Sequence, residues 1–232
     1  MASVDTYLVI NSEKFSTKIC YDFRSSLSAL AKDAEVDAAI LSTEDGFSPL
    51  GASRRFFQDD LGISEDGIRR LADWNFSGND LVTLIALKSQ RSESLLRGAI
   101  LAPGSHTRSY APFKRNGGRP SKDFYYGVSF EAIKYACLTW GSRKLSFSHL
   151  TAAGVYHQDI ATCHVEALIH FCEKFPNAAP ASLTFVGCCI DVDHLQGIRR
   201  LVEGGSFTSH RPICVAEDAS DDATLIHINF QN

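Results

Sequence analysis

The stretch "KLSFSHLTAAGVYHQDIATCHVEALIHFC", residues 144–172, joins a short apolar segment to an amphipathic helix through a loop of small residues. Residues 144–149 are predicted to form a strand, and the small loop after it ends at Gly154. Such a loop is either a plain connection or a phosphate site, because its backbone amides meet the positive end of the next helix. A helix is predicted over residues 158–174 from one face of helically spaced side chains: Ile160, Cys163, His164, Ala167, Leu168, Phe171 and Cys172.

The same alternation of strands and helices continues on both sides of this stretch. Helices are predicted over 130–140 and 194–202, and a strand over 182–190. Upstream, "VDAAILST" (36–43) is a nearly continuous apolar run, as expected for a strand covered on both faces. Further predicted strands are 6–10, 16–23, 80–87, 97–104 and an edge strand 223–230, and further helices are 25–32, 50–59 and 64–74. We therefore predict one domain over residues 1–232, a three-layer α/β/α fold around a mixed, mostly parallel sheet.

Composition excludes several classes of protein. The 232 residues are 44% hydrophobic, enough for a sizeable core, and the net charge of -4 comes from interspersed charges, so we expect no nucleic-acid or membrane partner. No apolar run approaches the roughly 20 residues needed to span a bilayer, and the N-terminus lacks a signal-peptide pattern, so we expect a cytoplasmic protein. The seven cysteines are odd in number and lie mostly in apolar segments, which favours reduced core thiols over disulfides.

The run "KLSFSHLTAAGVYHQDIATCHVEALIHFCEKFP", followed by "SLTFVGCCIDVDHLQGIRRLVE", resembles the C-terminal half of a macro domain. "EVDAAILS" (35–42) is similar to an earlier strand of that family. The resemblance implies a macro domain-like α/β/α module that binds ADP-ribose or relatives, and some members of the family remove ADP-ribose from proteins. By the same resemblance Gly154, Val155 and Tyr156 match the diphosphate loop, while His157 stands where the family has a second glycine.

The segment 105–126 is the longest stretch without helical or strand periodicity, and it is basic. Arg115 and Arg119 flank "NGG" there, and guanidinium groups suit phosphate and carboxylate groups. The segment is either a solvated loop or an anion clamp on the same rim as the Gly154 loop. Its aromatic residues are candidates for a surface on which a base stacks: Tyr110, Phe113, Phe124, Tyr125 and Tyr126.

Three functional hypotheses remain. The first is binding or processing of an ADP-ribose-like or other phosphorylated nucleotide, without a further cofactor, by a site that combines Gly154, Val155, Tyr156, His157, Arg115 and Arg119. The second is a ligand-free interaction module or homo-oligomer that keeps the fold, which the departures from the family loops favour. The third is a hydrolase that uses His149 or His157. A metal site is not predicted, because Asp193 as a helix N-cap explains the cluster of Asp191, Asp193 and His194 more simply.

Overall fold

The computed structural model describes residues 5–22, 26–43, 55–67, 81–103, 114–115, 119–120, 122–147, 157–186, 192–205, 207, 213–219 and 223–230. Nine strands within these residues form one sheet in the order β1-β2-β9-β8-β3-β5-β4-β11-β10. Strands β2, β9, β8, β3 and β5 run parallel, and the other neighbours pair antiparallel. The strands are β1 (Asp5–Asn11), β2 (Ser16–Asp22), β3 (Ala38–Thr43), β4 (Leu81–Lys88), β5 (Gly98–Pro103), β8 (Lys144–Phe147), β9 (Ser182–Val186), β10 (Ile213–Ala219) and β11 (Thr224–Phe230).

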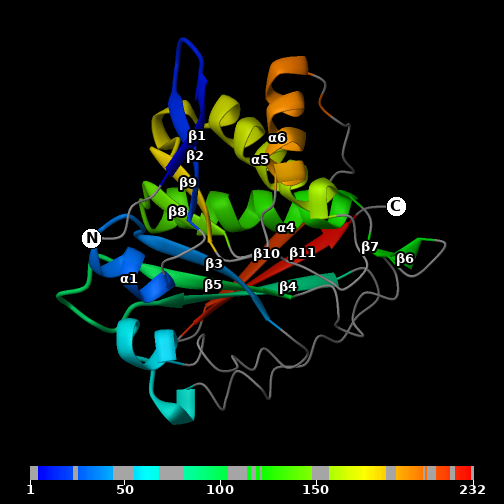
Figure 1. The fold of residues 1–232 in the computed structure, drawn as a ribbon. Coiled ribbons are helices and arrows are strands. Elements are labelled where there is room, and N and C mark those ends of the chain that lie inside the picture. Colours follow the sequence, from blue (N-terminus) through cyan, green and yellow to red (C-terminus); the bar gives the residue numbers. More distant parts are fainter. Residues whose placement is uncertain are drawn as a thin grey trace.

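Helices cover both faces of this sheet (Figure 1). Helix α1 (Leu27–Lys32) and the π-helical turn η2 (Phe56–Asp60) lie on one side, and α4 (Lys122–Lys134), α5 (His157–Lys174) and α6 (Val192–Gly204) lie on the other. A second π-helical turn, η4 (Tyr135–Thr139), continues α4, and a short 3-10 turn, η5 (Pro176–Ala178), follows α5. A separate two-stranded ladder joins β6 (Lys114–Arg115) to β7 (Arg119–Pro120). The predicted three-layer α/β/α architecture with a mixed, mostly parallel sheet is confirmed.

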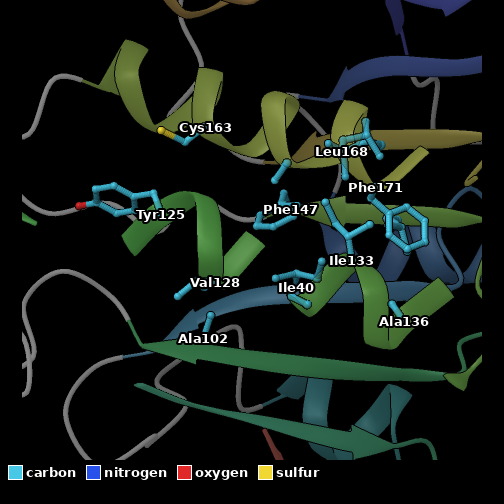
Figure 2. Packing of buried hydrophobic residues seen from close by; sticks show 14 of the residues in the cluster. Ile40, Ala102, Tyr125, Val128, Ile133, Ala136, Phe147, Cys163, Leu168 and Phe171 are labelled. Atoms are coloured by element: carbon cyan, nitrogen blue, oxygen red, sulfur yellow. The ribbon is translucent and has the colours of Figure 1, made fainter. Parts of the chain in front are cut away.

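The central strands are apolar on both faces, which is why two helical layers form. In β3, Ala38 and Ile40 join the core under α4 and α5, whereas Ala39 and Leu41 join the core under α1 and η2. Successive side chains of a strand point to opposite faces, so a continuous apolar run needs cover on both sides. Figure 2 shows Ile40 and Ala102 below Val128 and Ile133 of α4.

The layer of α4 and α5 is held by apolar packing and by two hydrogen bonds to histidines of α5. The Tyr126 hydroxyl lies 2.9 Å from His170 Nδ1, and the Ser129 hydroxyl lies 2.6 Å from His164 Nδ1. Burial raises the pKa of Tyr126 to about 12, and the carboxylates of Glu166, Glu131 and Glu173 add to the shift. The phenol therefore keeps its proton at neutral pH, and its oxygen is hydrogen-bonded to His170 Nδ1.

Two sequence predictions are wrong in detail. Helix α4 begins at Lys122, eight residues before the predicted start at 130, so residues 122–126 are helical and not part of an irregular loop. Strand β11 is not at the edge of the sheet, because β10 pairs along its outer side. The other predicted strands and the helix of α5 are confirmed within the described residues. Parts of several predicted elements lie outside these residues, among them 50–54, 68–74, 148–149 and 187–190. Among the described residues, no helix combines the length and the apolarity that crossing a bilayer requires.

The described cysteines with resolved side chains are buried thiols, namely Cys20, Cys137, Cys163 and Cys172. Burial raises the pKa of Cys137 to about 12 and that of Cys172 to about 11, and it also raises the pKa of Cys20. Only the thiolate is a strong nucleophile, so these groups are poorly reactive near neutral pH. Since their folded pKa values exceed the ordinary value of 9.0, they contribute stability that is complete below about pH 9 and is lost as the pH rises toward 12.

We predict that iodoacetamide at pH 8 leaves Cys137 and Cys172 unmodified in the native protein, because hardly any thiolate forms there and the sulfur atoms are buried. Mass spectrometry of tryptic peptides measures the modification of each cysteine. The same reaction in denaturant is the control and should label all seven cysteines. Rapid native labelling of Cys137 would contradict the packing described above.

Candidate site at the carboxyl ends of the parallel strands

The parallel strands end side by side along one edge of the sheet. Asp22, the last residue of β2, pairs with Val186, the last residue of β9. Phe147, the last residue of β8, pairs with Ile40, after which β3 continues from Leu41 to Thr43. The described part of β8 therefore ends beside Ile40 of β3. Ligands of open α/β sheets bind at this end of the strands.

Three helices begin at this same edge. Helix α4 follows β5 in the chain after the short strands β6 and β7, α5 follows β8, and α6 follows β9. Helices α4 and α5 return across the sheet to the starts of β8 and β9, respectively. Their first turns carry backbone N–H groups without partners in the helix and the positive end of the helix dipole. The convergence of three helix starts makes this edge electrostatically suited to an anion.

His164 of α5 contacts both the last residue of β8 and helix α4. Its ring stacks on Phe147 with centroids 4.3 Å apart and planes at 25°, and it lies 6.2 Å from the ring of Phe185. The Ser129 hydroxyl donates to the carbonyl oxygen of Tyr125 at 2.5 Å, so its oxygen accepts from His164 Nδ1. The last residue of β8 thus contacts the second turn of α5 through the Phe147–His164 stack, and α4 is linked to the same turn through the Ser129–His164 hydrogen bond. Figure 2 shows Phe147 between the two helices.

Asp22 is a functional candidate that the sequence analysis missed. It is only 3% exposed although it is an acidic residue, and it ends β2 on the same edge as Val186. A carboxylate is costly to bury unless it interacts with donors, so acidic groups at such positions are frequent in functional sites. The signal in the sequence is an acidic residue directly after the apolar run "ICY".

The predicted site residues fall in different parts of the structure. His157 is the first residue of α5, and Arg115 lies directly opposite Arg119 in the β6–β7 ladder. Gly154, Val155 and Tyr156 lie outside the described residues, as does His149. Figure 1 shows the β6–β7 hairpin beyond the end of the sheet at which α4 begins.

The predicted aromatic surface is wrong for at least two of its members. Phe124 is fully buried and Tyr125 is 2% exposed, because both lie in the first turn of α4 and pack into the core. Tyr126 is half-buried between Phe130 and His170, with ring centroids 5.9 Å and 5.6 Å away. These three residues therefore hold α4 in place, while Tyr110 and Phe113 lie outside the described residues.

Within the described residues, no group of three or more His, Cys, Asp or Glu side chains is placed to hold a metal ion. Of the cluster considered in the sequence, Asp191 lies outside these residues, and Asp193 and His194 belong to the first turn of α6.

No protein-family profile and no curated protein matches the sequence. Solved macro domains are similar in structure. The Trypanosoma brucei macrodomain in complex with ADP-ribose has a TM-score of 0.51 at 13% identity, over 79% of this chain and 68% of that one. The Oceanobacillus iheyensis macrodomain with ADP has a TM-score of 0.52 at 10% identity, over 87% and 99%. The macro domain of ganglioside induced differentiation associated protein 2 has 0.51 at 12%, over 79% and 82%. The chain therefore has a macro domain-like fold, as the resemblance in sequence predicted.

We predict that His164→Ala lowers the free energy of unfolding by about 3 kcal/mol, because it removes the stack on Phe147 and leaves the Ser129 hydroxyl without this partner. Urea denaturation followed by circular dichroism measures the change. The control is Leu138→Ala at a side chain that is 46% exposed, for which we expect a change within about 0.5 kcal/mol. Equal effects of the two substitutions would mean that His164 does not anchor the loop.

Proposed function

We propose that the protein binds ADP-ribose, or a phosphorylated nucleotide of similar chemistry, at the loops that follow β3, β5, β8 and β9. The observation that carries this proposal is the convergence of strand ends and helix starts at one edge of a macro domain-like sheet. The similar structures from Trypanosoma brucei and Oceanobacillus iheyensis hold ADP-ribose and ADP, respectively.

The loop 148–156 is the proposed diphosphate loop, with Gly154, Val155 and Tyr156 presenting backbone amides and His157 beginning the helix behind them. Support comes from the fixed ends of the loop, Phe147 and the start of α5, and from the positive end of that helix. A small residue at position 154 matters, because a bulky side chain would keep phosphate oxygens away from the amides.

Arg115 and Arg119 are the proposed source of positive charge. They oppose one another in the antiparallel β6–β7 ladder. Guanidinium groups form charge-assisted hydrogen bonds with phosphate oxygens, so two arginines at paired positions of one ladder favour an anionic ligand.

Asp22 extends the proposal to the nucleoside part of the ligand. A buried carboxylate accepts hydrogen bonds and repels phosphate, so in this site it suits an N–H or hydroxyl donor of a base or ribose. Phosphate and nucleoside would then be held by different groups along the same edge. We assign no catalytic residue.

We predict that Gly154→Leu lowers the affinity for ADP-ribose at least about tenfold, equivalent to about 1.4 kcal/mol, without lowering the unfolding temperature. Isothermal titration calorimetry measures the affinity. The matched control is Gly204→Leu in α6, where an added Cβ meets no atom within 4 Å. Unchanged affinity in Gly154→Leu would remove the loop from the site. If the wild-type protein binds no nucleotide and forms a stable oligomer in analytical ultracentrifugation, the interaction module is the better description.

We also predict that replacing Arg115 and Arg119 together by Ala weakens ADP-ribose binding at least about tenfold, since each charge-assisted hydrogen bond contributes about 1.5–3 kcal/mol. The loss should shrink as salt screens the charges. Arg200→Ala in α6 is the control, because Arg200 is exposed and its guanidinium donates to Gln196 Oε1 of the same helix. Equal affinities for the double variant and the wild type would show that the hairpin does not contact the ligand.

A further inference from the structure

A cavity of about 370 Å³ lies at the opposite end of the sheet from the strand-end site. It is formed between the β4–β5 connection, residues 89–97, and the residues that end η4. Because β5 starts at Gly98, this connection lies at the amino end of β5, and Figure 1 shows it as the green loop at the left. The cavity is therefore separate from the loops proposed to bind ADP-ribose.

The charges that line this cavity are all positive. Lys88, Arg91 and Arg97 contribute to its wall, and within the described residues none of them forms an ion pair with a carboxylate. The single acidic residue of the connection, Glu93, does not line the cavity. Asp37, whose backbone oxygen accepts from Arg97 N, directs its carboxylate to the backbone N–H groups of Arg143 and Lys144 instead. Concave surfaces lined by one sign of charge attract counter-ions.

The polar groups of the cavity are mainly donors. The Ser89 hydroxyl accepts from the backbone N–H of Arg91 at 3.3 Å, and the Ser94 hydroxyl accepts from that of Leu96 at 3.1 Å. Each hydroxyl keeps its own proton, for which the described residues supply no acceptor. With three cations and two hydroxyl protons, the cavity has several donors and few acceptors, as a phosphate group requires.

Trp140 gives the cavity a fixed aromatic wall. Its ring packs edge to face against Tyr135, with centroids 5.3 Å apart at 83°. It also lies over Gly98, where an added Cβ would be 2.7 Å from Trp140 Cη2 and closer still to the carbonyl oxygen of Leu87. The Arg97 guanidinium donates from Nη1 to the carbonyl oxygen of Trp140, so the aromatic wall and one cation are tied together.

We propose that this cavity is a second ligand site, which binds a nucleoside monophosphate or a ligand of the same chemistry, a phosphate group attached to a small planar ring system. Lys88, Arg91 and Arg97 hold the phosphate with the serine hydroxyls, and the ring system lies against Trp140. The volume is at the lower end of the range of about 300–1,000 Å³ that is usual for ligand pockets, which suits a ligand of this size.

The experiment titrates AMP into the Trp74→Phe variant and follows the fluorescence of Trp140, which is then the single tryptophan of the chain. Excitation at the red edge of the tryptophan absorption avoids absorption by adenine. We expect a saturable change in emission, and at least about tenfold weaker binding in Arg91→Glu. Arg200→Glu carries the same change of charge at an exposed position on α6 and should bind as the parent does. Inorganic phosphate should compete with AMP, because the two share the phosphate contacts.

Two results would overturn this second site: no saturable response of Trp140 to AMP, or equal affinities for Arg91→Glu and Arg200→Glu. Calorimetry of AMP binding to the wild-type protein and to the single variant Arg91→Glu makes the same comparison with Trp74 in place. Adding Gly154→Leu separates the two proposals. If the Trp140 response persists in that variant, the cavity binds independently of the strand-end loops. If it disappears, the strand-end site is the only one, and the proposed function stands without this inference.

Discussion

The structure depends on the burial of β3 on both of its faces. Ala38 and Ile40 are buried beneath one helical layer and Ala39 and Leu41 beneath the other, so neither face tolerates exposure to water. Parallel neighbours on both sides require crossover connections, and these supply the helices that cover the faces. All parallel strands then end at one edge, where the helices begin. The location proposed for the ligand thus follows from how the central strand is covered.

The sequence predicts elements well where the apolar pattern is strong. The continuous run of β3 and the helical face of α5 are both confirmed. The predicted start of helix α4 is too late, because its first two turns, "KDFYYGVS", contain aromatic residues and a glycine, which have low helix propensity. The burial of Phe124 and Tyr125 in the core outweighs that low propensity. Strand β10 was missed because "ICVAEDA" has acidic residues and no clear alternation, and its pairing with β11 supplies the stability.

The residues of the proposed sites are less predictable because they depend on contacts between distant segments. The loop around Gly154 was recognised from its small residues, yet nothing in the sequence shows that Phe147 and His164 stack to fix its ends. The opposition of Arg115 and Arg119 likewise depends on a register that no short motif encodes. Asp22 is an acidic residue at the end of a strand, and the sequence does not indicate that it is buried.

The two ends of the sheet differ in what they offer an anion. At the carboxyl ends, helix starts supply backbone N–H groups and a positive dipole, so a phosphate there needs small residues more than it needs charged side chains. At the other end, α4 and η4 finish and present carbonyl oxygens, which disfavour an anion; the carbonyl of Trp140 is already occupied by Arg97. An anion at that end must therefore be held by side chains, which accounts for the concentration of Lys88, Arg91 and Arg97 around one cavity. In the two proposals, one mixed sheet thus carries backbone recognition of an anion at one end and side-chain recognition at the other.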